Sequence, residues 1–226
     1  MDRKHNVNVI FLKTDSKKMT EVKTTTITRD IIENAYSYEE YRELIDDLLK
    51  EGKTTGENHS ESMLHYTKMN VHRMKRLDRR TDLSDEIRER LEKVERPMIW
   101  LVLTEAWCGD AAQSLPIIQK MADTSSKILI RYILRDKNPE IMDQFLTDGK
   151  SRSIPKVIVL DMKSLEILGE WGPRPDTAQK LFENLRNRDD VPRQTAAENL
   201  HKWYADDNTE SMQMEFVSLL DKWEQR

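Results

Sequence analysis

The spacing of inward-facing residues predicts helices in the first third of the chain. Ser37 and Glu40 match the Ser-x-x-Glu pattern of a helix-capping box, and Gly52 suits the end of that helix. The helical period recurs from about residue 60 to 80 and again after Ser84. Its inward positions are Tyr41, Leu44, Ile45, Leu48, Leu49, Leu64, Thr67, Val71, Met74, Leu77, Ile87, Leu91 and Val94. We expect these amphipathic helices to pack on another part of the protein.

The pattern changes after Pro97. Residues 98–103 form a continuous apolar run, which is typical of a strand buried on both faces. Similar runs at 128–134, 157–160 and 165–171 predict three more strands, and helices are expected from Gly109 onward, at 139–146 and at 177–185. Strands that alternate with helices predict an α/β unit with a partly parallel sheet covered on both sides.

The chain becomes helical again after Asp189. Pro192 fits a first helical turn. Ala197, Leu200 and Tyr204 share one predicted face, and a second helix presents Met212, Phe216, Leu219 and Trp223. The predicted organisation is therefore a poorly anchored segment at 1–28, a helical extension at 29–95, an α/β domain at 96–188 and C-terminal helices at 189–226.

Composition narrows the class of protein. Of the 226 residues, 35% are charged and 37% hydrophobic, which favours a soluble protein with much solvated helix. The net charge of −4 gives no general attraction to nucleic acid or anionic lipid. The longest apolar run, 98–103, is too short to cross a bilayer, and the N-terminus lacks a signal-peptide pattern. We expect a cytoplasmic protein with neither a membrane nor nucleic acid among its partners.

Several weak motifs carry no function in this interpretation. The single cysteine excludes an internal disulfide and any zinc site built from several thiolates. His65 and His72 lie two helical turns apart but fit surface positions, so no metal is expected. A basic cluster comprises Lys68, Arg73, Lys75, Arg76, Arg79 and Arg80. It could contact RNA or an acidic partner, but a solvated face balanced by Asp82, Asp85, Glu86 and Glu89 is the favoured interpretation.

Cys108 is the candidate for chemistry because it follows a predicted strand and opens a predicted helix. Helix N-termini carry unpaired amides and partial positive charge, which favour thiolate. We therefore predict a partly exposed thiol with a pKa below the free value of about 8.5, although the charge of Asp110 opposes the shift. The alternative, a small buried hydrophobe, fits less well between Trp107 and Gly109.

Three segments together resemble the thioredoxin-like superfamily. Residues 106–111, Ala-Trp-Cys-Gly-Asp-Ala, resemble the active-site segment Trp-Cys-Gly-Pro-Cys. Residues 153–156, Ser-Ile-Pro-Lys, resemble the loop whose cis proline faces the active cysteine. Residues 169–175 lie where the family has its last hairpin strand and a substrate-facing glycine. The resemblance covers about residues 96–188, and the whole chain is similar to bacterial thioredoxin-family proteins with added N-terminal helices.

The resemblance implies a thioredoxin-like fold, in which helices flank a mixed central sheet, and a role in cell redox homeostasis. It assigns Cys108 as the catalytic nucleophile and predicts a cis Ile154–Pro155 bond beside the Cys108 sulfur. The implied substrate groove comprises Trp107, Gly109, Asp110, Ala111, Ile154, Pro155 and Gly172. It implies no cofactor.

Departures from the family pattern limit this chemistry. Ala111 replaces the resolving cysteine, Asp110 replaces proline, and Val102 stands where many thioredoxins have a buried carboxylate. Glu105 could substitute for that carboxylate, but we expect it to face solvent. A lone thiol can attack a disulfide and form a mixed disulfide, but its release needs an external thiol.

Two main hypotheses remain open. One is monothiol exchange through Cys108, with a protein disulfide or a small-molecule thiol as the reaction partner. The other is a catalytically inactive thioredoxin-fold module that binds a protein partner in the groove or on the added helices, because fold alone does not decide function. Regulatory redox sensing is a third reading. The sequence leaves the oligomeric state open.

Overall fold

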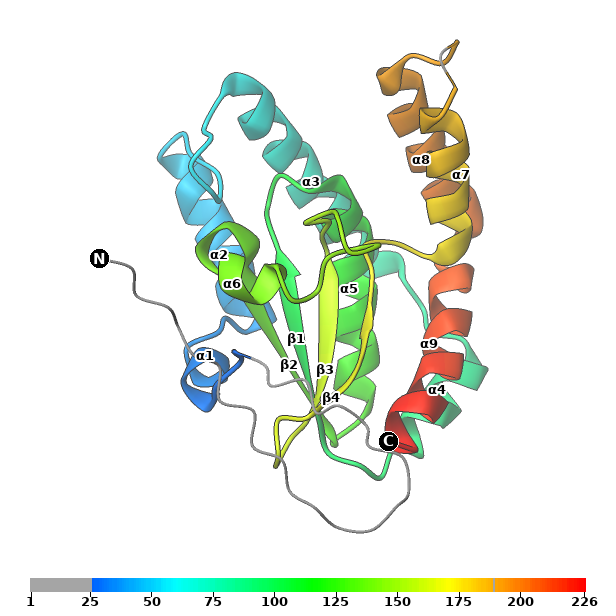
Figure 1. Ribbon diagram of the computed structural model, residues 1–226. Helices are drawn as coiled ribbons and strands as arrows, with labels where there is room; N and C mark the ends of the chain where they lie inside the picture. Colours follow the sequence, from blue (N-terminus) through cyan, green and yellow to red (C-terminus); the bar gives the residue numbers. More distant parts are fainter. Residues whose placement is uncertain (1–25, 189) are drawn as a thin grey trace, which may run out of the picture.

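A four-stranded mixed sheet forms the centre of the computed structural model, which describes residues 26–188 and 190–226 (Figure 1). The central strand β1 (Met98–Thr104) pairs in parallel with β2 (Ile128–Leu134). On its other side β1 pairs antiparallel with β3 (Lys156–Asp161), which pairs antiparallel with β4 (Ile167–Trp171). The order β2-β1-β3-β4 confirms the predicted α/β fold.

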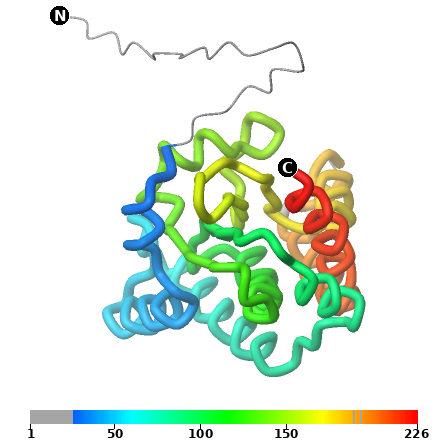
Figure 2. Tube along the Cα trace, turned by 90° about the horizontal axis from the view of Figure 1, so that it is seen from below, coloured from blue at the N-terminus to red at the C-terminus, as the bar shows by residue number. Residues whose placement is uncertain are grey.

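Helices cover both faces of the sheet, so every residue of β1 is buried. Figure 2 shows the two layers with the sheet seen edge-on. The larger core cluster joins one face of the sheet to α2 (Tyr38–Lys50), α3 (Glu61–Arg80), α4 (Asp85–Glu92), α5 (Gly109–Thr124) and α9 (Glu210–Glu224). The opposite face packs on α1 (Arg29–Glu33) and α6 (Pro139–Met142), and the 3₁₀ turn η1 (Arg135–Lys137), which has no buried residue, leads into α6. The remaining helices, α7 (Asp176–Arg186) and α8 (Arg193–Asp207), pack on each other.

The predicted helix starts are confirmed by their caps. Thr28 caps α1, Ser37 and Glu40 form the complete capping box of α2, and Ser84 caps α4. The predicted inward residues Thr67, Val71, Met74, Ile87, Leu91 and Val94 are buried, whereas Leu64 and Leu77 are only partly buried. Asn70 is also fully buried, which the apolar pattern did not indicate.

Three element details differ from the predictions. α6 ends at Met142 instead of 146, because the chain tightens into turn-type hydrogen bonds that bring Phe145 into the core. β4 begins at Ile167 instead of 165, because Leu165 adopts a left-handed turn conformation with φ 60°. In α8 the buried face contains Ala196 and Leu200, one turn apart, whereas Ala197 is exposed.

The flanking helices share the core of the sheet. Trp100 of β1 lies 5.4 Å from Phe216 and 5.9 Å from Trp223 between ring centroids. On the other flank, Tyr41 stacks on Tyr132 with ring centroids 5.7 Å apart. Both added segments thus dock on the α/β unit, as their amphipathic patterns predicted, while the domain boundaries at 96 and 189 stay predictions. Of the segment predicted to be poorly anchored, residues 1–25 lie outside the described residues, and Ile27 is buried.

Candidate functional site

Cys108 lies between the end of β1 and the first turn of α5, where it is the N-cap residue. The amide of Ala111 donates to its Sγ at 3.5 Å, and its thiol donates to the carbonyl oxygen of Ile154 at 3.2 Å. The residue is partly exposed, as predicted. The sulfur therefore sits against the loop that precedes β3, in the arrangement that the two sequence motifs indicated.

The loop beside the sulfur has the predicted cis peptide bond between Ile154 and Pro155, and both residues are buried. Gly172 supports this loop from behind. Its φ of +115° favours glycine, and a Cβ at this position would lie only 2.2 Å from the Pro155 carbonyl oxygen. Gly172 therefore packs on Pro155, and the following Gly172–Pro173 bond is also cis, which the sequence analysis did not predict.

Asp110 is fixed by two residues from distant parts of the chain. Its carboxylate accepts hydrogen bonds from the Tyr204 hydroxyl of α8 at 2.8 Å and from the Arg174 guanidinium at 2.5 Å. The Arg174 and Asp110 side chains are only 10% and 13% exposed. Arg174 also stacks over Phe182, with 4.3 Å between Cζ and the ring centroid. The position that resembles the family's proline thus holds a carboxylate in a shielded ion pair, and sequence analysis identified neither Arg174 nor Tyr204.

Although the residue is partly exposed, burial of its thiol group controls the ionisation of Cys108. Burial and then the negative charge of Asp110 raise the pKa of the Cys108 thiol to about 12, and the nearby amides and Arg174 only partly offset this. The prediction of a depressed pKa is therefore wrong. The helix N-terminus does favour thiolate through these amides, but desolvation at this packed site is the larger effect.

Glu105 corrects a second prediction, because its side chain is buried and not solvent-facing. Its Oε1 accepts a hydrogen bond from the Asp136 amide at 2.9 Å, whereas its Oε2 has no hydrogen-bond partner among the described residues. Burial raises the pKa of this carboxyl group. The end of β1 is covered by neighbouring segments, so the chain reaches Cys108 through an enclosed turn.

The helical extension holds this turn in place. The hydroxyl oxygen of Thr55 accepts from the Ala106 amide at 2.8 Å, and the side-chain amide of Asn70 donates to the Ala106 carbonyl at 2.9 Å. Both contacts are buried. Trp107 is partly exposed and lies under the Arg135 guanidinium, 4.8 Å from Cζ to the ring centroid. Residues far upstream of the resembling segment therefore satisfy the backbone beside Cys108.

Two of the predicted groove residues face neighbouring helices. A Cβ on Gly109 would lie 3.3 Å from Cε1 of His201 and 3.5 Å from an Nη atom of Arg73. Nδ1 of His201 is buried without a hydrogen-bond partner among the described residues, and burial lowers the pKa of this imidazole. Ala111 is 1% exposed and belongs to the core. Thus α8 and α3 flank the first turn of α5.

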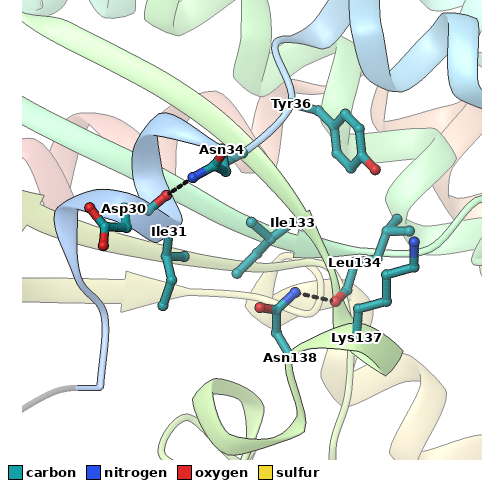
Figure 3. A pocket seen from close by; sticks show the side chains of 9 residues that line it. Asp30, Ile31, Asn34, Tyr36, Ile133, Leu134, Lys137 and Asn138 are labelled. Atoms are coloured by element: carbon teal, nitrogen blue, oxygen red, sulfur yellow. Dashed lines mark hydrogen bonds between the residues drawn. The ribbon is translucent and has the colours of Figure 1, made fainter.

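Two cavities lie outside this turn. A cleft of about 520 Å³ between β4 and α9 is lined in part by Lys156, Gly172 and Arg174, so it adjoins the loop of Pro155. A pocket of about 340 Å³ lies on the opposite face, between α1 and β2 (Figure 3). Its Asn34 and Asn138 side chains bond to the backbone of their own segments. None of the residues that line this second pocket is one of the predicted groove residues.

The described part of the chain contains no cluster of three or more residues suited to hold a metal ion. None of its helices has the length and apolar character needed to span a membrane.

Comparisons with known proteins agree with this geometry. A family model described as "Thioredoxin" matches residues 56–186, which is more than half of the chain and includes α3 and α4. A crystal structure of a protein of unknown function from Pseudomonas aeruginosa is similar at 19% identity, with 82% of this chain and 98% of that chain covered and a TM-score of 0.50. A crystal structure of an HIV epitope-scaffold matches at 19% identity over 78% and 96% of the two chains, with a TM-score of 0.49. A search of curated proteins found no match.

Proposed function

The chain belongs to the thioredoxin family, and from this premise we propose that it exchanges thiols and disulfides through Cys108 alone, with an external thiol completing the cycle. The observation that supports this is the position of the Cys108 sulfur. It caps α5 and lies 3.2 Å from the Ile154 carbonyl, at the edge of the Pro155 loop. The proposal places this activity in redox homeostasis of a bacterial cytoplasm.

The proposed reaction has two balanced steps. The Cys108 thiol loses its proton, and its sulfur attacks one sulfur of a substrate disulfide. The substrate S–S bond breaks, the leaving sulfur takes up a proton, and a mixed disulfide to Cys108 remains. A thiol from a small molecule or a partner protein then attacks this mixed disulfide and restores the Cys108 thiol. The external thiol is required because Ala111 occupies the resolving position and Cys108 is the single cysteine.

The site's own residues set the rate of the first step. With a thiol pKa of about 12, a fraction on the order of 10⁻⁵ is thiolate at pH 7. The substrate's approach must therefore supply part of the activation, for example by changing the surroundings of the thiol. Asp110, held by Arg174 and Tyr204, acts against the thiolate and so favours a slow, selective exchange.

The same protonated thiol favours a second candidate function, a binding module that uses the groove at Pro155 without covalent chemistry. The two functions differ in their need for the sulfur. A binding module retains its partner when Cys108 is replaced by serine, whereas an exchanger loses its covalent product.

Reaction with an aromatic disulfide that releases a coloured thiolate tests the proposal. We expect the wild-type protein to gain the mass of one mixed-disulfide adduct, slowly at pH 7 and faster at pH 9, and to return to its original mass when a small thiol is added. Cys108→Ser should gain no mass. Absence of an adduct on the folded wild-type protein at pH 9, while the urea-unfolded protein reacts at once, would contradict exchange and favour the binding module.

A further inference from the structure

The outer face of α3 carries exposed cationic side chains that form no direct ion pair among the described residues. The exposed cationic residues on this helix are Lys68, Lys75, Arg76, Arg79 and Arg80, and His65 and His72 are exposed beside them. We call Lys68, His72, Lys75, Arg76 and Arg79 the basic face of α3. Their spacing of three or four residues places them along one side of the helix, over roughly 17 Å.

The expected balancing acids do not pair with this face. Among the described residues, no carboxylate lies within 4.0 Å of any cation of the basic face. Glu89 of α4 forms its ion pair with Lys93 instead. Asp78, which belongs to α3 itself, accepts hydrogen bonds from Arg42 and Tyr38. The solvated face balanced by nearby acids stays a prediction, but no direct ion pair within the described chain holds it. Like charges one turn apart repel each other, so binding of a partner's carboxylates would relieve that repulsion.

Arg73 links one edge of the basic face to the Cys108 turn. It lies one helical turn before Arg76 and donates to Asn70 at 2.9 Å, and Asn70, on the inner side of α3, donates to the Ala106 carbonyl. An Nη atom of Arg73 lies 3.5 Å from the Cβ position of Gly109. Figures 1 and 2 show α3 at the periphery of the molecule, with α5 on its inner side. A partner that binds at the Arg76 edge of the basic face would thus lie beside Arg73, whose guanidinium reaches the first turn of α5.

We propose that the basic face of α3 docks an acidic protein surface and thereby brings that partner's sulfur to Cys108. This rests on the proposed exchange function and assigns its substrate class: a protein or peptide with a cluster of Asp and Glu beside its reactive disulfide. A protein fits better than a nucleic acid because the neighbouring chemistry acts on sulfur, which nucleic acids lack.

Peptides with one cysteine, activated as a mixed disulfide with a coloured aromatic thiol, test the docking. Three peptides of equal length are compared, with acidic, neutral or basic residues around the cysteine. At low ionic strength the acidic peptide should react with Cys108 about tenfold faster than the neutral one, and the basic peptide should react more slowly still. The difference should disappear near 1 M salt, where the screening length is about 3 Å.

Two variants of the basic face locate the effect. The triple variants Lys75→Glu/Arg76→Glu/Arg79→Glu and Lys75→Gln/Arg76→Gln/Arg79→Gln should both lose the preference for the acidic peptide. The control Lys150→Glu/Lys163→Glu/Lys222→Glu makes the same change in net charge as the triple Glu variant, at exposed positions on other elements, and should keep most of the preference. Equal rates for acidic and neutral peptides, or a preference that the basic-face variants retain, would overturn the proposal.

A binding measurement on Cys108→Ser separates this proposal from the exchange function. Fluorescence anisotropy of the labelled acidic peptide without its activating group reports docking alone. If the peptide binds through the basic face but no peptide exchanges with Cys108, the docking proposal stands and the proposed exchange function is wrong. Tighter, basic-face-dependent binding of a single-stranded oligonucleotide of the same charge would overturn the choice of a protein partner.

Discussion

The two flanks of the Cys108 turn are built differently. On the α3 flank, neutral side chains satisfy the backbone of Ala106: Thr55 accepts from its amide and Asn70 donates to its carbonyl. On the α8 flank, a charged network meets the turn, in which Tyr204 and Arg174 hold Asp110 and His201 has a buried, unpaired Nδ1. The first flank fixes where the sulfur lies, and the second adds the charge of Asp110 to the effect of burial on its ionisation. Stability and reactivity should therefore respond to different substitutions.

The largest expected effect is the pH dependence of Cys108 reactivity. Because the thiol pKa is about 12, thiolate should increase tenfold for each pH unit, and alkylation by iodoacetamide should accelerate about a thousandfold from pH 7 to pH 10 without a plateau. The protonated folded form also contributes stability that is present below about pH 8.5, the unfolded value, and is lost as pH rises toward 12. A plateau below pH 8 would show that the α8 flank does not suppress ionisation.

The next effect concerns the α3 flank. Asn70→Leu should lower the free energy of unfolding by about 2–3 kcal/mol, because it leaves the buried Ala106 carbonyl and Arg73 without their partner. Urea denaturation followed by circular dichroism measures this. Asn199→Leu, on the exposed surface of α8, is the matched control and should change the free energy by less than about 0.5 kcal/mol. Equal losses of unfolding free energy in the two variants would contradict a structural role for Asn70 on the α3 flank.

A smaller effect is expected on the α8 flank. Asp110→Asn removes the negative charge beside the thiol and leaves Arg174 unpaired, and both changes favour thiolate. Alkylation at pH 8 should become about tenfold faster, equivalent to about one pKa unit. Tyr204→Phe should accelerate it less, because the charge of Asp110 remains. The control Asp206→Asn, at an exposed position of the same helix, should leave the alkylation rate of Cys108 unchanged. If Asp110→Asn also left this rate unchanged, burial alone would set the pKa of the thiol.

The smallest change restores the second thiol at the turn. Ala111 follows Cys108 by three residues, and its amide lies 3.5 Å from the sulfur. Ala111→Cys should therefore lose two hydrogens on oxidation, detected by mass spectrometry, and gain partial insulin-reducing activity. Full activity is not expected, since Val102 and Asp110 still depart from the family pattern. Strong insulin reduction by the wild-type protein without added small thiol would contradict the need for an external thiol.

Local signals in the sequence predicted the fold and the centre of the site. The apolar run of β1, the caps at Ser37 and Ser84, and the motifs around Cys108 and Pro155 each act over a few residues. The ionisation of Cys108 could not be predicted in this way. Its surroundings come from Arg174, 64 positions after Asp110, and Tyr204, 94 positions after it. Glu105 was placed wrongly for the same reason, because segments distant in sequence cover the end of β1.

The aromatic cluster formed by Trp100, Phe216 and Trp223 has a consequence for the order of folding. Trp100 belongs to the central strand, yet its ring packs on Phe216 and Trp223 of α9, and Trp223 lies against the backbone of Gly169, where a Cβ would be 2.1 Å from its Nε1. The contacts of Trp100 join residues more than a hundred positions apart, so their formation requires closure of a long loop. Docking of α9 should therefore be a late event, and until then part of one face of β1 lacks its cover. Indole fluorescence in a refolding experiment would report this last step directly, while far-ultraviolet circular dichroism would report the helices that form before it.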